Sequence, residues 1–81
     1  MIYSMYSVLD NLTGKYFAPV MMMNDEEAKR QFKGQVNNIQ LWKDNPSDFD
    51  LWKLGTFEEE TGMIDYNPEK ICGGRSVLNV W

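Results

Sequence analysis

Histidine is absent from the 81 residues of this chain, and cysteine occurs once, at Cys72. Without histidine the chain lacks the commonest general base and the commonest metal ligand of proteins. Serine triads and cysteine–histidine pairs cannot form within one chain, so we expect a protein that is not an enzyme. A single cysteine excludes an internal disulfide and is typical of a reducing, cytoplasmic setting.

Long apolar runs are missing as well. No run approaches the roughly 20 residues that a membrane-spanning helix needs. The first six residues lack the charged start and the apolar core of a secretory signal peptide. We therefore expect neither membrane insertion nor export.

Positive charge is scarce. Eight lysines and arginines stand against 12 aspartates and glutamates, which gives a formal charge of −4. Because phosphate backbones repel a chain of this sign, sequence-independent binding to duplex DNA is disfavoured, although a local basic patch could overcome the net charge. Glycine-rich phosphate-binding loops are also missing, so we expect no nucleotide cofactor.

The acidic residues Asp44, Asp48 and Asp50 suggest a calcium-binding loop at first glance. Such a loop needs glycine at its sixth position and glutamate at its twelfth, where this chain has Phe49 and Gly55. We therefore interpret these carboxylates as solvated turn and capping residues. No metal site and no other cofactor is expected.

The apolar content is sufficient for one core, since 43% of the residues are hydrophobic and 14% are aromatic. A chain of this length forms one domain. We place a single α+β domain at residues 1–70 and a flexible C-terminal tail at residues 71–81. The apolar end of that tail either docks into a groove, of its own chain or of a partner, or stays disordered.

Strand-forming residues gather in two pairs of segments, each pair joined by a turn. Both turns share an acid-x-x-Thr-Gly pattern, which suits a three-residue hairpin loop closed by a left-handed glycine. Pro19 is expected at a sheet edge or a bulge, and Pro68 is expected to end the last strand. The predicted strands are residues 2–9, 16–23, 51–58 and 63–66.

The clearest local signal predicts a helix at about residues 25–38. Asn24 can cap its N-terminus, and Glu27 completes a capping box. A short helical turn is also expected at residues 45–48. Apolar residues recur along the long helix at steps of four and three, which lays one apolar stripe along it, formed by Ala28, Phe32, Val36 and Ile39.

The predicted order is therefore ββαββ. This is an α+β fold in which two hairpins form one antiparallel sheet and one helix packs on one face. The first strand is apolar on both sides, so a single helix leaves one face of the sheet uncovered. That face has to meet a partner, a second copy of the chain or the C-terminal tail, and we expect a homodimer.

Two groups of residues are candidates for contact with nucleic acid. Lys29, Arg30 and Lys33 form a small basic patch on the predicted helix. Strand aromatics can stack on unpaired bases, and the candidates for this are Tyr6, Tyr16 and Trp52. Both groups have an ordinary alternative, because helices show lysines on their solvated face and strand aromatics usually fill a core.

Several short motifs follow one another at a recognisable spacing between residues 3 and 66. They are Tyr3–Asp10, Ala18-Pro19, Asp25–Ala28 followed by Phe32, Val36-Asn37, Asn45–Phe49, Leu51–Phe57 and Thr61-Gly62. In this order they resemble the small non-structural protein of gokushovirus-type microviruses, which are single-stranded DNA phages. The chain differs from that pattern in having one proline rather than two in its second strand.

The resemblance implies a phage protein that acts in the host cytoplasm and is absent from the virion. It further implies a non-enzymatic binding protein in viral single-stranded DNA synthesis or packaging. The partners would be single-stranded DNA or phage replication and packaging proteins. The alternative is a protein–protein adaptor that binds a host or phage protein without contacting DNA.

Overall fold

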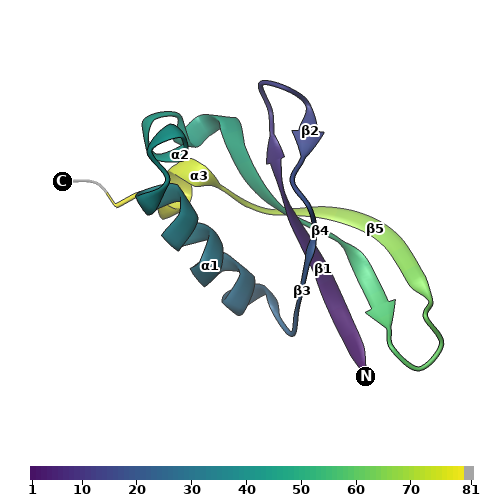
Figure 1. Cartoon of the computed structure of the whole chain (residues 1–81). Coiled ribbons are helices and arrows are strands. Elements are labelled where there is room, and N and C mark those ends of the chain that lie inside the picture. The colour runs from purple at the N-terminus through teal and green to yellow at the C-terminus, as the bar shows by residue number, and fades with distance from the viewer. Residues whose placement is uncertain (80–81) are drawn as a thin grey trace.

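The structure, a computed structural model, describes residues 1–79 and has one five-stranded antiparallel sheet with helices beside it (Figure 1). The fold is α+β, as predicted. Its elements are β1 (Ile2–Asp10), β2 (Lys15–Tyr16), β3 (Val20–Met22), α1 (Asp25–Asn38), α2 (Gln40–Asp44), a 3-10 turn η1 (Pro46–Asp48), β4 (Phe49–Glu58), β5 (Ile64–Gly73) and α3 (Gly74–Val77).

The strand order is β2-β1-β4-β5, with β3 paired to β1 on the same side as β2. The first strand of the chain is therefore a central strand of the sheet. The hairpin of β4 and β5 lies along the other side of β1, where Tyr6 pairs with Lys53 and Val8 pairs with Leu51. Both predicted hairpins thus belong to one antiparallel sheet.

The predicted order ββαββ with one helix is wrong in two respects. The return strand expected at residues 16–23 is divided into β2 and β3, because the chain leaves the ladder at Phe17, Ala18 and Pro19. In this gap the hydroxyl of Ser7 donates a hydrogen bond of 2.5 Å to the carbonyl oxygen of Phe17. Two further short helices, α2 and α3, also exceed the prediction of a single helix.

Pro68 does not end the last strand, which corrects a second expectation. Lys53 pairs with Glu69 and Gly55 pairs with Tyr66, so two β5 residues stand opposite Leu54 alone. This is a β-bulge on an edge strand, where proline removes no hydrogen bond from the ladder. The strand therefore continues to Gly73.

Where the sequence predicts a tail from residue 71 onward, the structure has the end of β5 followed by α3. The α3 helix packs against α1 and η1, and Val77 and Leu78 pack against the buried core. The side chain of Asn37 on α1 donates a hydrogen bond to the carbonyl of Val77 at 3.0 Å and accepts one from the Asn79 amide at 2.7 Å. Val80 and Trp81 lie outside the described residues.

The α1 helix forms where its local signals predict it. The Asn24 side chain accepts a hydrogen bond from the Glu27 amide at 2.9 Å, so it caps the first turn. Ala28, Phe32 and Val36 are buried, as the stripe predicts, whereas Ile39 lies beyond the last turn and is 40% exposed.

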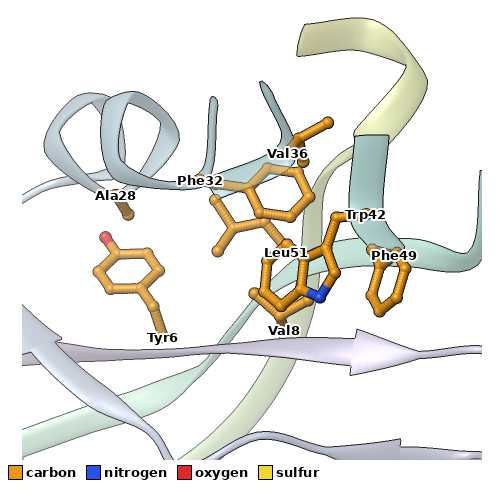
Figure 2. Packing of buried hydrophobic residues seen from close by; sticks show 8 residues of the cluster. All are labelled: Tyr6, Val8, Ala28, Phe32, Val36, Trp42, Phe49 and Leu51. Atoms are coloured by element: carbon orange, nitrogen blue, oxygen red, sulfur yellow. The ribbon is translucent and has the colours of Figure 1, made fainter. Parts of the chain in front are cut away.

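The core lies between α1 and the sheet (Figure 2). The unpredicted helix α2 contributes Trp42, whose ring stacks on Phe49 at a centroid distance of 4.8 Å. Because α2 follows α1 directly, it brings this indole over the end of the sheet that α1 does not reach. The buried cluster consists of Tyr6, Val8, Ala28, Phe32, Val36, Trp42, Phe49 and Leu51.

Tyr6 predicts a pH dependence of stability. Its side chain points from β1 to α1 (Figure 2). Its hydroxyl donates a hydrogen bond of 2.5 Å to the Asp25 carboxylate. Burial, together with this bond, raises the pKa of Tyr6 from 10.0 to about 12. Because the folded state holds the proton more tightly, this contribution to stability is complete below pH 10 and is lost as the pH rises through about 12.

We expect Tyr6→Phe to reduce the fall in stability over that pH window, because the variant has no phenol to ionise. At neutral pH the same change should cost about 1.5 kcal/mol through loss of a hydrogen bond to a carboxylate. Urea unfolding at a series of pH values measures both effects. All other ionisable groups are the same in the two proteins, so an equal slope in the two would contradict the prediction.

Candidate functional site

The strand register divides the sheet into two faces. Paired residues of antiparallel strands carry their side chains on the same face, and the faces alternate along each strand. Tyr6 and Val8 point to α1, so the alternate residues of β1 and their partners point away from it. We call this second surface the open face, formed by Tyr3, Met5, Ser7, Leu9, Tyr16, Met21, Asp50, Trp52, Phe57, Ile64, Tyr66 and Lys70. Met5 and Ser7 on β1 are themselves buried, so the solvent-exposed apolar part of this face consists of Tyr16, Met21, Ile64 and Tyr66.

Apolar side chains dominate the open face. Ile64 and Tyr66 on β5 are 62% and 69% exposed, and Met21 on β3 is 48% exposed. The two charged members, Asp50 and Lys70, form an ion pair at 3.5 Å. The face is therefore apolar and electrically balanced, which is the character of a protein interaction surface rather than of an ordinary solvated sheet.

The helices lie on the other side of the sheet. The α3 helix packs against α1 and η1, so the chain from residue 74 to residue 79 leaves the open face uncovered. The sequence predicts three possible covers for this face: a partner, a second copy of the chain or the C-terminal tail. The described part of the tail lies on the other side of the sheet, so it is not the cover, and the other two remain.

Trp52 lies on β4 within the open face, where it pairs with Ser7 on β1 and with Lys70 on β5. Its indole N–H is buried and has no hydrogen-bond acceptor within residues 1–79. A buried donor without a partner is rare and costs about 1–3 kcal/mol. The unpaired indole N–H of Trp52 therefore lowers the free energy of unfolding of the isolated chain.

The six predicted site residues do not form one surface. Tyr16 and Trp52 belong to the open face, whereas Tyr6 is fully buried in the core and has no ring surface available for a base. Lys29, Arg30 and Lys33 lie on α1 and line a groove together with Asn24, Glu26, Glu27 and Val77.

The electrostatics of that groove are mixed. The ammonium group of Lys29 lies 3.4 Å from the Glu26 carboxylate, so one of the three predicted cations is already paired. Arg30 and Lys33 are exposed. The helix groove and the open face are separated by the sheet, so the predicted cations and the aromatic residues cannot contact the same short nucleic-acid segment.

The predicted strand 63–66 contains Ile64 and Tyr66, but sequence reasoning did not name them as members of an exposed apolar face. The signal that could have found them is the alternation of these two large apolar residues with Asp65 and Asn67.

Cys72 lies at the helix side of β5 and is half-buried. Burial raises the pKa of its thiol, although the nearby Lys29 ammonium partly opposes this effect. The thiol is therefore protonated at neutral pH and is a poor nucleophile. Within residues 1–79 no three potential ligands gather as a metal site, and no helix among them is long and apolar enough to cross a membrane.

The geometry describes a small α+β protein whose helix layer covers one face of the sheet and whose other face is apolar and open. Comparison with protein families then places it. The model of the family described as phage ORF5 protein matches residues 3–77, so the chain belongs to this family of phage proteins. The comparisons with curated proteins and with solved structures find no match.

Proposed function

We propose that this phage protein is a non-enzymatic binding protein that acts in viral single-stranded DNA synthesis or packaging in the host cytoplasm. Membership of the phage ORF5 family supports the phage origin. The motif order over residues 3–66 supports the narrower assignment to gokushovirus-type microviruses. The open face is the observation that carries the proposal, because an uncovered apolar surface gains free energy when a partner excludes water from it.

The open face favours a protein partner over DNA. Its only cation within the described chain, Lys70, is engaged by Asp50. Without a free cation, this face offers phosphate groups no counter-charge. The adaptor mode, in which the chain binds a host or phage protein without contacting DNA, therefore fits this surface better than DNA binding does.

A homodimer through the open face is the simplest form of such contact. In a twofold dimer the same patch of each subunit meets its copy, so a balanced apolar patch can complement itself. The sheet edges are poor alternatives, because Pro19 interrupts one and Pro68 forms a bulge in the other. Association by the face is thus favoured over association by strand addition.

The replacement Ile64→Lys tests this dimer. Ile64 is 62% exposed, so the change leaves the core intact and places a charge in the proposed interface. We expect the dissociation constant to rise at least about tenfold, as one buried unpaired charge costs more than about 1.4 kcal/mol. Sedimentation velocity over a range of concentrations measures this constant.

Leu12→Lys is the matched control, because Leu12 is 81% exposed in the turn between β1 and β2 and the change adds the same charge. It should dimerise like the unmodified chain. A monomer at every concentration of the unmodified chain would rule out the homodimer and leave the open face to a different protein.

A second candidate mode is contact with single-stranded DNA through the α1 groove. The observation in its favour is that Lys29, Arg30 and Lys33 line one groove. Three phosphate contacts to a single strand predict a slope of about −2 for the logarithm of the binding constant against that of salt. Titration with a short single strand at low and moderate salt, followed by tryptophan fluorescence, measures it.

An equal-length duplex is the control for strand preference, and replacement of the three cations by glutamine is the control for the groove. Saturable binding that prefers the single strand and is lost in the triple variant would support DNA contact. A protein that does not respond at low salt has an ordinary solvated helix at this position.

A further inference from the structure

A second apolar surface lies on the helix side of the sheet. A pocket of about 340 Å³ opens between α1 and the chain segment from Phe17 to Met22. Its floor consists of core side chains, among them Phe32 and Trp42, and Val20 forms part of its wall. The division of the return strand into β2 and β3 places this segment beside α1, so the pocket follows from the interruption at Pro19.

The chemistry of the pocket is uniform. All of its lining residues are uncharged, and most are apolar. Gln31 and Gln35, one helical turn apart on α1, supply the polar groups at its lining, and neither side-chain amide makes a hydrogen bond within the described chain. An apolar cavity with two free carboxamides suits an uncharged group joined to a polar main chain, and it does not suit a phosphate.

The apolar surface extends beyond the cavity. Phe17, Val20 and Ile39 line the pocket and remain 45%, 42% and 40% exposed. A small molecule inside the cavity would leave these outer surfaces in water. The occupant that covers both the cavity and its apolar border is therefore a segment of a macromolecule with one side chain inserted.

One end of the pocket is acidic. Tyr6 lines the pocket, and its hydroxyl is bonded to Asp25, the first residue of α1. Glu27 follows in the same turn and is exposed, whereas the carboxylate of Glu26 is already paired with the Lys29 ammonium at 3.4 Å. A partner with a basic residue beside its apolar anchor would complement this charge.

We propose that this pocket binds a bulky apolar side chain, of the leucine, phenylalanine or tryptophan kind, carried by an amphipathic, basic segment of a partner protein. The volume is adequate, since a cavity of about 150 Å³ already holds a benzene ring in another protein. The carboxamides of Gln31 and Gln35 bind the main chain beside the anchor. This site lies on the opposite side of the sheet from the open face and does not depend on it.

Fluorescence of Trp42 is a direct reporter, because its indole lines the pocket. Replacing Trp52 and Trp81 by phenylalanine leaves Trp42 as the only one of the three tryptophans. The probe is a synthetic amphipathic peptide with leucine anchors and flanking lysines. One comparison peptide has alanine in place of leucine, and another has glutamate in place of lysine.

We expect a saturable change in Trp42 emission with the leucine–lysine peptide, weaker binding of the glutamate peptide and none of the alanine peptide. Val20→Lys at the pocket border should weaken binding by at least about tenfold, and the control Leu12→Lys should not. Gln35→Ala is a second border variant that adds no charge, and it should weaken binding while circular dichroism confirms the fold.

Amide chemical shifts give an independent location for the peptide. Shifts at Gln31, Gln35 and Val20 support the proposal. Shifts confined to Tyr66 and its neighbours would place the peptide on the open face and overturn it. Equal binding by Val20→Lys and Leu12→Lys, or saturable binding of the uncharged dye Nile red without any binding of the peptide, would also overturn it.

Discussion

Replacement of Gly55 by alanine is expected to lower the free energy of unfolding by at least about 3 kcal/mol, or to prevent folding. Gly55 has a φ of 156°, a conformation that other residues rarely adopt. A Cβ atom at this position would lie 1.9 Å from the carbonyl oxygen of Asp65. Because that neighbour is backbone on the paired strand β5, no side-chain rotation can relieve the contact.

The register explains why the chain needs glycine here. Leu54, the residue before Gly55, has no partner on β1, because Met5 pairs with Gly55 and Tyr6 pairs with Lys53. On its other side Leu54 stands opposite the bulge in β5. Gly34→Ala is the matched control, because a Cβ at Gly34 would meet nothing within 4 Å and alanine favours a helix interior by about 1 kcal/mol. Urea denaturation should show that Gly55→Ala lowers the free energy of unfolding and that Gly34→Ala raises it. An unchanged midpoint for Gly55→Ala would contradict the described register.

Trp42→Ala is expected to have the second largest effect, a loss of about 3–5 kcal/mol. The indole is 6% exposed, and its ring centroid lies 4.8 Å from that of Phe49, 5.3 Å from Phe17 and 6.4 Å from Phe32. Its removal would leave a cavity that joins the pocket beside α1. A domain of this size has only about 5–15 kcal/mol in total, so the variant should be close to unfolding.

Leu41→Ala on the same short helix provides the control for Trp42. Leu41 is 61% exposed, so its truncation should change the free energy of unfolding by less than about 0.5 kcal/mol. Circular dichroism during thermal and urea unfolding is suitable, because it does not depend on the tryptophan that is removed. Similar midpoints for both variants would show that α2 does not complete the core.

The elements that the sequence predicts well are those with local causes. The α1 helix has its own cap and its own apolar stripe, and both turns have their glycine in the left-handed region, with φ of 74° at Gly14 and 73° at Gly62. The uncovered sheet face also follows from a local pattern, the two apolar sides of β1. These features need no knowledge of strand order.

The features that were missed depend on contacts between distant segments. The bulge at Pro68 is set by the register of β5 on β4, and α3 forms where Gly74 can approach the Pro46 carbonyl closely. The break at Pro19 shifts the alternation by one residue, so Tyr16 and Met21 share a face although they are five positions apart. Alternation along a single unbroken strand would therefore place Tyr16 and Met21 on opposite faces.

The candidate site has the same limitation. Residue types identified Tyr16 and Trp52 as candidates for stacking on bases, and the open face contains both, although Trp52 is only partly exposed. Nothing in the sequence indicates that the cations of α1 lie on the other side of the sheet from them. That separation is a consequence of tertiary packing, and it is one reason why we propose a protein rather than DNA as the partner.

The central position of β1 has a consequence for synthesis of the protein. The ribosome makes this strand before the other strands of the sheet, and its long neighbour β4 is complete only at Glu58. Until then the nascent chain carries an apolar strand with one unpaired edge, a state that aggregates readily. The yield of folded protein in an infected cell should therefore depend on how quickly translation passes residues 23–58 and on the chaperones that meet the chain during that interval.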